Sequence, residues 1–363
     1  MMKKPGKFRK FLILPAAVVL ALVLVLLGYA VYLFADYSRI EDNIMLSVRD
    51  ASPDVMEVGQ SYTALSYNIG FAAYTPEFSF FMDGGTESRA FSKADVLETM
   101  DGICTLLAEQ DADIIFLEEV DEKSTRSWHV NERARIEEAF PGYDASFAVN
   151  WDSSYLFYPF TQPHGKSLSG LATLSKFDLT SSIRRSLPVE TSLMKFVDLD
   201  RCYTVSRIPV ANGRELVLYT VHLSAYTSDG IIATRQLELL IEDMQAQVEA
   251  GNYVLCGGDF NKDLLGDSSA YFGVSGDAYT WAQPFPTQML TSTGLSLAVP
   301  LGDGEVIPSC RNADLPYHDG QFVLTVDGFI VSDNIRVEES TVIDTGFAFS
   351  DHNPVRLKFV LEE

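Results

Sequence analysis

Polar residues that could hydrolyse a phosphate ester stand at the ends of apolar runs in this chain. They are Asn68, Glu119, His222, Asp259 and Asn261. Such hydrolysis needs a divalent cation to neutralise the phosphoryl oxygens, a group that activates water, and donors that stabilise the developing charge. Mg²⁺ prefers one or two carboxylates together with water molecules, so isolated acids and amides are its expected signature. These residue types and their spacing therefore predict metal-assisted hydrolysis.

A second polar group lies near the C-terminus. His352 follows Asp351, and Asp327 interrupts the apolar run over 325–330. A carboxylate inside an apolar strand is costly to bury unless it is paired, and an imidazolium is a suitable partner. We therefore expect Asp327 to pair with His352.

The segment 257–261 reads Gly-Gly-Asp-Phe-Asn and follows an apolar run. Strand alternation would place Asp259 and Asn261 on one side and Phe260 in the core. Glycines at 257 and 258 would allow the backbone to approach a ligand closely. Taken singly, each polar residue is an ordinary strand-end residue, but the ordered set favours a function.

The elements that must position these residues alternate between strands and helices. Apolar runs predict strands at 62–69, 113–120, 145–150, 170–175, 203–210, 215–223, 253–257, 322–331 and 355–361. Helices are expected at 92–110, 126–140 and 231–249, the first with a capping box formed by Ser92 and Asp95. This α/β pattern predicts two sheets packed face to face with helices on the outside.

The N-terminus differs from the rest of the chain. Five basic residues in segment 1–10 precede an uncharged stretch over 11–34. A helix of that length covers the ~30 Å hydrocarbon core of a bilayer, whereas a cleaved signal peptide has a shorter apolar region of roughly 7–15 residues. We expect a single-pass anchor at 11–34, rather than a cleaved signal, with 1–10 in the cytoplasm. A stalk at 35–59 and a catalytic domain at 60–363 would then face outward from the cell membrane.

The chain beyond residue 10 is strongly acidic. It carries all fifty acidic residues and 22 of the 27 basic ones, a formal charge of −28. Such a surface repels nucleic acid at long range, and no Lys/Arg run outside the N-terminus offsets it. This disfavours a processive or high-affinity nuclease without excluding hydrolysis.

Four cysteines, Cys104, Cys202, Cys256 and Cys310, show no metal-ligand or redox spacing. Their even number permits disulfides in an exported domain. We favour small buried side chains, because Cys104 and Cys256 lie in predicted apolar positions.

Seven motifs occur in one order along residues 60–361. They are Leu-Ser-Tyr-Asn-Ile at 65–69, Leu-Glu-Glu-Val-Asp at 117–121, Gly-Leu-Ala-Thr-Leu-Ser-Lys-Phe at 170–177, Thr-Val-His-Leu at 220–223, Gly-Asp-Phe-Asn at 258–261, Val-Asp-Gly at 326–328 and Ser-Asp-His-Asn-Pro-Val at 350–355. This series resembles the endonuclease/exonuclease/phosphatase superfamily, which includes pancreatic-type deoxyribonucleases, abasic-site endonucleases, inositol-polyphosphate phosphatases and neutral sphingomyelinases. The resemblance implies a four-layer α/β sandwich and Mg²⁺-dependent attack of water on phosphorus, with Mn²⁺ or Ca²⁺ as alternative cations.

The resemblance also implies roles for the motif residues. Glu119 would bind the metal directly, with Asn68 and Asp351 close to it. The catalytic residues would be His222, Asp259, Asn261, Asp327 and His352. Both imidazoles would contact the scissile phosphate, that of His352 being held by Asp327, while Asp259 and Asn261 would position water and a phosphate oxygen. Whether His352 or Asp259 accepts the proton of the water stays open.

Three further residues are less typical of the superfamily. Glu118 stands where relatives commonly have Gln, and we expect it to add charge near the site. The positions of Lys166 and His164 resemble one at which relatives have a basic residue that contacts phosphate. The alternative is that both residues lie in a solvated loop without a role in binding.

We expect a membrane-anchored phosphoesterase, with a phosphodiester favoured, acting on a lipid head group, a nucleic acid or a small phosphodiester. No protein partner is predicted. The alternatives are an extracellular nuclease and a non-catalytic surface protein that retains the fold. Aromatic loops at 71–82 and 151–160 could stack a base, enter a lipid interface or simply pack on the sandwich.

Overall fold

The computed structural model describes residues 7–225, 231–275, 281–302 and 304–363. The chain divides into two compact units, one that ends at Arg39 and one that runs from Ile40 to Glu363. The first unit holds helix α1 (Lys7–Asp36), whose segment Ile13–Asp36 has a mean hydropathy of 2.7 and is not buried. This one helix is long and apolar enough to cross a membrane.

The second unit contains two seven-stranded sheets and a short hairpin. In spatial order the first sheet consists of β1 (Ile44–Met45), β7 (Ser181–Ser186), β8 (Cys202–Pro209), β9 (Glu215–His222), β10 (Tyr253–Asp259), β14 (Asp327–Ser332) and β11 (Leu295–Ala298). The second sheet consists of β15 (Ile335–Val342), β16 (Val355–Leu361), β3 (Ser61–Asn68), β4 (Ile114–Asp121), β6 (Leu168–Ser175), β5 (Asp144–Asp152) and β2 (Val48–Arg49). Strands β12 (Cys310–Arg311) and β13 (Val323–Leu324) pair separately. Both large sheets are mixed, because β9 is parallel to β10 and β3 is parallel to β4, whereas the other neighbouring strands are antiparallel.

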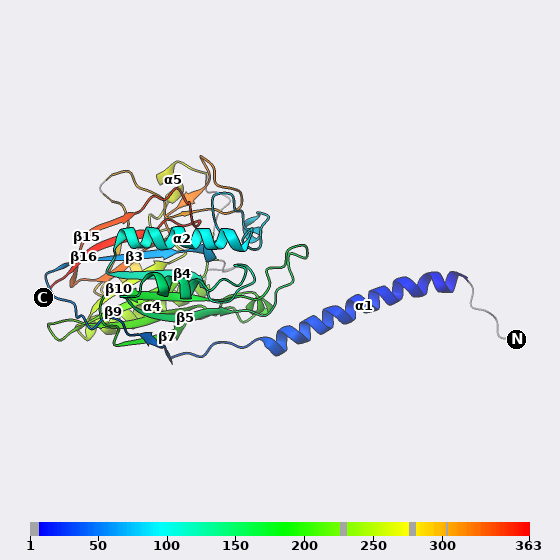
Figure 1. Ribbon diagram of the computed structural model, residues 1–363, viewed down its shortest axis with the longest axis horizontal. Helices are drawn as coiled ribbons and strands as arrows, with labels where there is room; N and C mark the ends of the chain where they lie inside the picture. Colours follow the sequence, from blue (N-terminus) through cyan, green and yellow to red (C-terminus); the bar gives the residue numbers. More distant parts are fainter. Residues whose placement is uncertain (1–6, 226–230, 276–280, 303) are drawn as a thin grey trace. The chain divides into compact units, whose positions relative to one another are not determined.

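Helices accompany these sheets. They are α2 (Lys93–Gln110), α3 (Glu132–Ala139), α4 (Ile231–Glu249) and α5 (Ser268–Phe272), with 3₁₀ turns η1 (Gly70–Ala72), η2 (Phe81–Asp83), η3 (Leu193–Phe196) and η4 (Thr287–Leu290). Figure 1 shows α2 lying along the strands of the second sheet.

Strand alternation produces the layers of this unit. In β9, Leu216 and Leu218 lie in the apolar core between the sheets, together with Ala64 of β3. Val217 and Tyr219 point to the opposite face and pack with α4. The apolar side of α2 packs in the same way on the outer face of the second sheet. The predicted α/β sandwich of two mixed sheets flanked by helices is therefore confirmed.

The strong hydrophobic periodicity of several elements predicted their bounds accurately. The helix at 231–249 and the strand at 355–361 have the predicted bounds. Ser92 caps α2, since its side chain accepts a hydrogen bond from the backbone N–H of Asp95.

The predicted helix at 126–140 is wrong over its first part. Helix α3 begins only at Glu132, and the side chain of Asn131 caps it by accepting from the Ala134 N–H. The preceding residues Trp128 and His129 have positive φ angles, which are incompatible with a right-handed helix. The predicted strand at 322–331 is likewise divided, because β13 pairs with β12 and β14 starts anew at Asp327.

The predicted stalk at 35–59 needs correction. Strand β1 extends the first sheet by pairing with β7, and β2 extends the second by pairing with β5. The Arg49 side chain also donates hydrogen bonds to the backbone carbonyls of Glu137, Phe140 and Tyr143. Residues from Ile40 onward therefore belong to the folded unit.

Candidate active site

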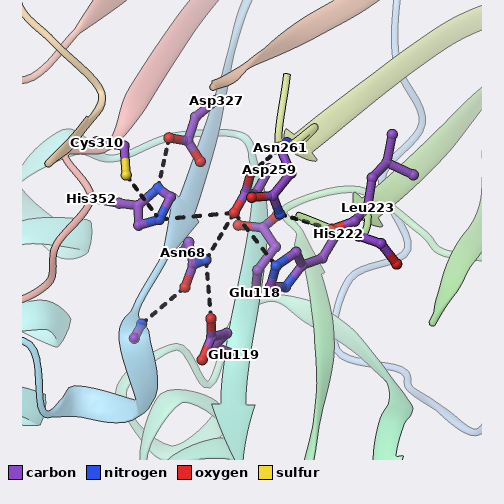
Figure 2. A network of polar contacts seen from close by, with 12 residues as sticks. Asn68, Glu118, Glu119, His222, Leu223, Asp259, Asn261, Cys310, Asp327 and His352 are labelled. Atoms are coloured by element: carbon purple, nitrogen blue, oxygen red, sulfur yellow. Dashed lines mark hydrogen bonds and ion pairs between the residues drawn. The ribbon is translucent and has the colours of Figure 1, made fainter. Parts of the chain in front are cut away.

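The strand registers bring the predicted polar residues to one end of the two sheets. In the first sheet, Asp259 is level with His222 on one side and with Asp327 on the other. In the second sheet, Asn68 ends β3, and His352 precedes β16, which is antiparallel to β3. Residues far apart in the sequence are therefore neighbours at the mouth of the sandwich (Figure 2).

The carboxylate of Asp259 is the centre of this cluster. Its Oδ2 atom lies 3.2 Å from Nδ2 of Asn68, 3.5 Å from Nε2 of His222 and 3.8 Å from Nε2 of His352. Its Oδ1 atom accepts a hydrogen bond from the Asn261 N–H at 2.8 Å. All five side chains are buried. The cluster joins both sheets, because Asn68 comes from the second sheet and Asp259 from the first.

Asn261 lies at the cluster, but the predicted strand alternation with Asp259 does not place it there. Strand β10 ends at Asp259, and Asn261 has a φ of 48°, so strand alternation does not extend to it. Its amide Nδ2 donates to the carbonyl of Leu223 at 2.8 Å. Phe260 does lie in the core, as expected.

A β-bulge aims Glu119 at the cluster. The pairing of β4 with β6 shifts by one residue between Leu117 and Val120, and Glu119 has a φ of 54°. A bulge of this kind redirects a side chain that regular alternation would place elsewhere. As a result, Oε1 of Glu119 lies 3.5 Å from Nδ2 of Asn68, and its Oε2 lies 3.4 Å from Nη1 of Arg126.

Asp351 lies on the Asn68 side of the site. The Ser350 hydroxyl is within hydrogen-bond distance of Asp351 Oδ1 at 3.2 Å and of the Asn68 carbonyl at 2.8 Å. Burial raises the pKa of Asp351, and the charge of Glu119 raises it further. Asp351 and Glu119 therefore repel one another electrostatically.

The two imidazoles differ in charge. Burial lowers the pKa of His222 well below its usual value, and the charge of Arg201 lowers it further, so His222 is neutral. Burial by itself would lower the pKa of His352. The attraction of the Asp327 carboxylate is larger than this effect and raises the pKa of His352 well above the usual value. His352 is therefore an imidazolium.

The acids in the cluster are also perturbed. Burial, followed by the charge of Asp327, raises the pKa of Asp259 to about 7. Oε1 of Glu118 lies 3.4 Å from the Ser66 hydroxyl, and its Oε2 has no hydrogen-bond partner among the described residues. Burial raises the pKa of Glu118 well above the usual value, and the charges of Asp327 and Asp259 reinforce this. Burial therefore disfavours the charged form of Glu118, in contrast to the expectation that it adds charge to the site.

The donor set fits a hard divalent cation. The carboxylates of Glu119, Asp259, Asp327 and Asp351 lie at the site. Oδ1 of Asp327 is buried without a hydrogen-bond partner in the described part of the chain. Ligand atoms of Asp259, Asp327 and His352 lie within 4.8 Å of one another. However, Asp327 and His352 already bond each other, so Glu119 and Asp351 are the better candidates for metal ligands. Asn68 turns its amide nitrogen to the acids, while its oxygen accepts from the Gly70 N–H.

His164 and Lys166 are not joined to the cluster by any described contact. His164 is 3% exposed and packs against Phe80, Phe81 and Trp151, while its Nδ1 lies 2.9 Å from the Ser88 carbonyl oxygen. Burial lowers its pKa to about 4, so His164 is neutral and enclosed rather than offered to a phosphate. Lys166 is half-exposed and forms an ion pair with Asp152 at 3.5 Å.

Three residues at the site were not predicted as site residues from the sequence. Arg126 pairs with Glu119 and Asp121. The thiol of Cys310 lies 3.6 Å from Nε2 of His352, and Arg201 contacts the backbone of His222. Only tertiary contacts identify them, because none stands in a motif or at a diagnostic spacing. All four cysteines are free, as favoured.

Comparisons with known proteins agree with this geometry. The sequence profile of the Endonuclease/Exonuclease/phosphatase family matches residues 65–352. No curated protein sequence matches the chain significantly.

Among solved structures, an endonuclease/exonuclease/phosphatase from Beutenbergia cavernae is 17% identical with a TM-score of 0.60, over 84% of this chain and 72% of that one. ANGEL2, a 2′,3′-cyclic phosphatase, is 17% identical with a TM-score of 0.56, over 88% and 99%. The catalytic domain of human Nocturnin is 17% identical with a TM-score of 0.51, over 86% and 97%.

The structural likeness shows the shared fold, and the profile covers most of the chain. Members of this family hydrolyse phosphoester bonds. The chain therefore belongs to the Endonuclease/Exonuclease/phosphatase family.

Proposed function

We propose that the protein is a divalent-metal-dependent phosphoesterase that prefers phosphodiesters. The observation that carries this proposal is the position of Asp259 Oδ2, which lies between the imidazoles of His222 and His352 and beside the amide of Asn68. An acid, two imidazoles and an amide that meet at one point can bind a phosphoryl group and activate water beside it.

Glu119 and Asp351 would hold the cation, with Asn68 beside them. When bound, a divalent ion neutralises charge on the phosphoryl oxygens. Mg²⁺ suits these oxygen donors, and Mn²⁺ or Ca²⁺ are alternatives.

The pKa directions suggest how protons move. Asp259, with a pKa of about 7, is suited to accept the proton of the attacking water. His352 already carries a proton, so it is suited to stabilise charge on the phosphoryl group or on the leaving oxygen. His222 is neutral and can donate one N–H to a phosphoryl oxygen.

The surroundings of the site favour a lipid head group or a small phosphodiester over a long nucleic acid. The −28 charge of the chain beyond residue 10 opposes nucleic acid. Helix α1 would anchor the protein in the cell membrane with the catalytic unit outside, because the basic segment precedes it. Phe157, Tyr158 and Phe160 are exposed aromatics of the kind found at lipid interfaces.

A substrate panel tests this proposal. The full-length protein in detergent would be assayed on bis(p-nitrophenyl) phosphate, p-nitrophenyl phosphate, sphingomyelin vesicles, phosphoinositide vesicles, RNA and plasmid DNA. We expect diester hydrolysis with Mg²⁺, its loss in chelator, and a decrease in kcat of at least about 100-fold in Glu119→Gln. The surface variant Glu339→Gln is the control, since Glu339 pairs with Arg356 on β15 and β16.

Hydrolysis of none of these phosphoesters in the presence of metal would contradict the proposal and favour a non-catalytic surface protein. Efficient cleavage of RNA or DNA alone would instead establish a nuclease. The membrane orientation has its own test: protease added to intact cells should remove the catalytic unit and leave α1 in the membrane fraction.

A further inference from the structure

Arg201 is a buried cation whose charge is poorly compensated. It directly precedes β8 and is 7% exposed. Its Nη1 donates one long hydrogen bond, 3.4 Å, to the backbone carbonyl of His222. Its Nε atom is buried and has no hydrogen-bond partner, and Arg201 forms no ion pair with the described residues.

Each of the other buried arginines of the described chain makes more hydrogen bonds or ion pairs than Arg201. Arg184 donates to the carbonyls of Val149, Glu41 and Asp200 and to the Ser186 hydroxyl. Arg126 forms ion pairs with two carboxylates. Arg311 also has a buried Nε without a hydrogen-bond partner among the described residues, but its Nη atoms donate to carbonyls at five positions: Asn312, Leu315, Tyr74, Thr75 and Phe78. The poor pairing of Arg201 is therefore not a general property of buried arginines in this fold.

An uncompensated buried charge is costly and is normally found paired or bound to a ligand. The cost is visible in Arg201 itself, because burial lowers the pKa of its guanidinium. A bound anion that pairs with the guanidinium would offset the free-energy cost of burying its charge. Arg201 therefore resembles one half of a binding site.

Arg201 lies within electrostatic reach of the catalytic cluster. Its charge lowers the pKa of His222, while the charge of Asp198 and, after it, the charges of Glu119 and Asp259 favour the charged form of Arg201 without forming an ion pair with it among the described residues. The backbone carbonyl that it contacts belongs to His222, which also lies 3.5 Å from Asp259. An anion that binds Arg201 would therefore lie at the His222 side of the cluster.

We propose that Arg201 is a substrate-binding residue whose guanidinium takes a phosphoryl oxygen of the substrate. This inference rests on the proposed function and extends it by a contact that the motifs do not contain. The planar guanidinium presents several N–H groups in a geometry that suits phosphate oxygens. It also supplies the local positive charge that a phosphate ester needs on an otherwise acidic protein.

Lys262 provides a matched control. It too is buried and forms no ion pair with the described residues, and burial lowers the pKa of its ammonium group. However, the pKa of Lys262 is lowered by burial alone, whereas that of Arg201 also responds to Glu119 and Asp259 of the catalytic cluster. Loss of this cation should leave phosphate binding at the site unchanged.

The test combines thermal unfolding with kinetics on the full-length protein in detergent with Mg²⁺. The variants are Arg201→Met, Arg201→Lys and Lys262→Met, and inorganic phosphate is the probe. We expect Arg201→Met to raise the unfolding midpoint without phosphate, because it removes a poorly paired buried charge. We expect the same variant to weaken phosphate binding roughly 10- to 100-fold, with partial recovery in Arg201→Lys and no change in Lys262→Met.

A structural role for Arg201 would give the opposite result, a lower midpoint with unchanged phosphate binding, and would overturn the inference. An equal loss of phosphate binding in Lys262→Met would also overturn it, because the effect would then reflect overall charge. Phosphate binding needs no turnover, so loss of binding in Arg201→Met without hydrolysis by the wild type would support Arg201 while contradicting the proposed function.

Kinetics distinguish the sources of the phosphoryl group. A higher KM in Arg201→Met for both bis(p-nitrophenyl) phosphate and sphingomyelin vesicles would show that Arg201 binds the phosphoryl group itself. A change with vesicles alone would assign Arg201 to a lipid head group. An unchanged KM for both, together with unchanged phosphate binding, would exclude the contact.

Discussion

Oδ2 of Asp327 lies 2.8 Å from Nδ1 of His352, and the Ser309 hydroxyl donates to the same oxygen at 2.7 Å. This double contact fixes the carboxylate, and the carboxylate in turn fixes the imidazole with its Nε2 toward Asp259. The pair is buried, so its charge interaction is only weakly screened by solvent.

Asp327→Asn should reduce kcat strongly with little loss of fold. The amide keeps the size of the side chain but removes the charge that raises the pKa of His352. We expect a decrease of about 10²- to 10⁴-fold in kcat for the preferred diester. Asp333→Asn is the control, since Asp333 is exposed just beyond the same strand. Retention of most activity in Asp327→Asn would show that the imidazolium is not required.

Arg126→Met should destabilise the catalytic unit by about 3–5 kcal/mol, because it leaves Asp121 buried without its cation. The guanidinium also stacks on Phe71, 3.9 Å from the ring centroid. Urea unfolding measures the change. Arg133→Met, which breaks partly exposed pairs with Glu122 and Glu137, should cost less than about 1 kcal/mol. Equal effects of the two variants would contradict this account.

Gly258→Ala should separate β9 from β10. Gly258 has a φ of 152°, and an added Cβ would lie 1.9 Å from the carbonyl oxygen of Val221. We expect a loss of about 3 kcal/mol or more in unfolding free energy, and a loss of activity because His222 and Asp259 no longer align. Gly251→Ala is the control: it has a φ of 85° but open space around the Cβ position, so its cost should be about 1 kcal/mol.

His164 should make the stability of the fold depend on pH. Its pKa is lowered to about 4 in the folded protein, so the unfolded chain binds an extra proton between about pH 6.5 and pH 4. The stability that His164 contributes is therefore complete above pH 6.5 and is lost as the pH falls toward 4, by up to about 3 kcal/mol. His164→Gln should flatten this part of the pH–stability curve, whereas His318→Gln, at an exposed position, should not. An unchanged slope of the pH–stability curve in His164→Gln would contradict the lowered pKa of His164.

The sequence predicted the sandwich and most of the cluster because both depend on short-range patterns. Apolar runs end where strands end, so Asn68, His222 and Asp259 could be located from the sequence alone. Glu119 is different, since its orientation depends on a one-residue bulge against β6 that alternation cannot reveal. The state of Glu118 depends on burial by both sheets, and burial is a tertiary property.

Long-range contacts explain the remaining errors. The segment 126–131 has helical composition, but hydrogen bonds from Arg126 and Ser127 to Asp121 hold it in turns. Arg201 stands in no motif, because what distinguishes it is that it forms no ion pair with the residues that the structure describes. The segment 40–59 looks like a polar linker, yet its two short strands find partners about 95–140 residues away.

Those two strands also decide where the chain can safely be shortened. A soluble version that starts at residue 60 would strip the outer backbone groups of β5 and β7 of their partners. Unpaired edge strands can pair with strands of other molecules, so such a protein should aggregate more readily than one that starts at residue 40, which keeps β1 and β2 paired with β7 and β5.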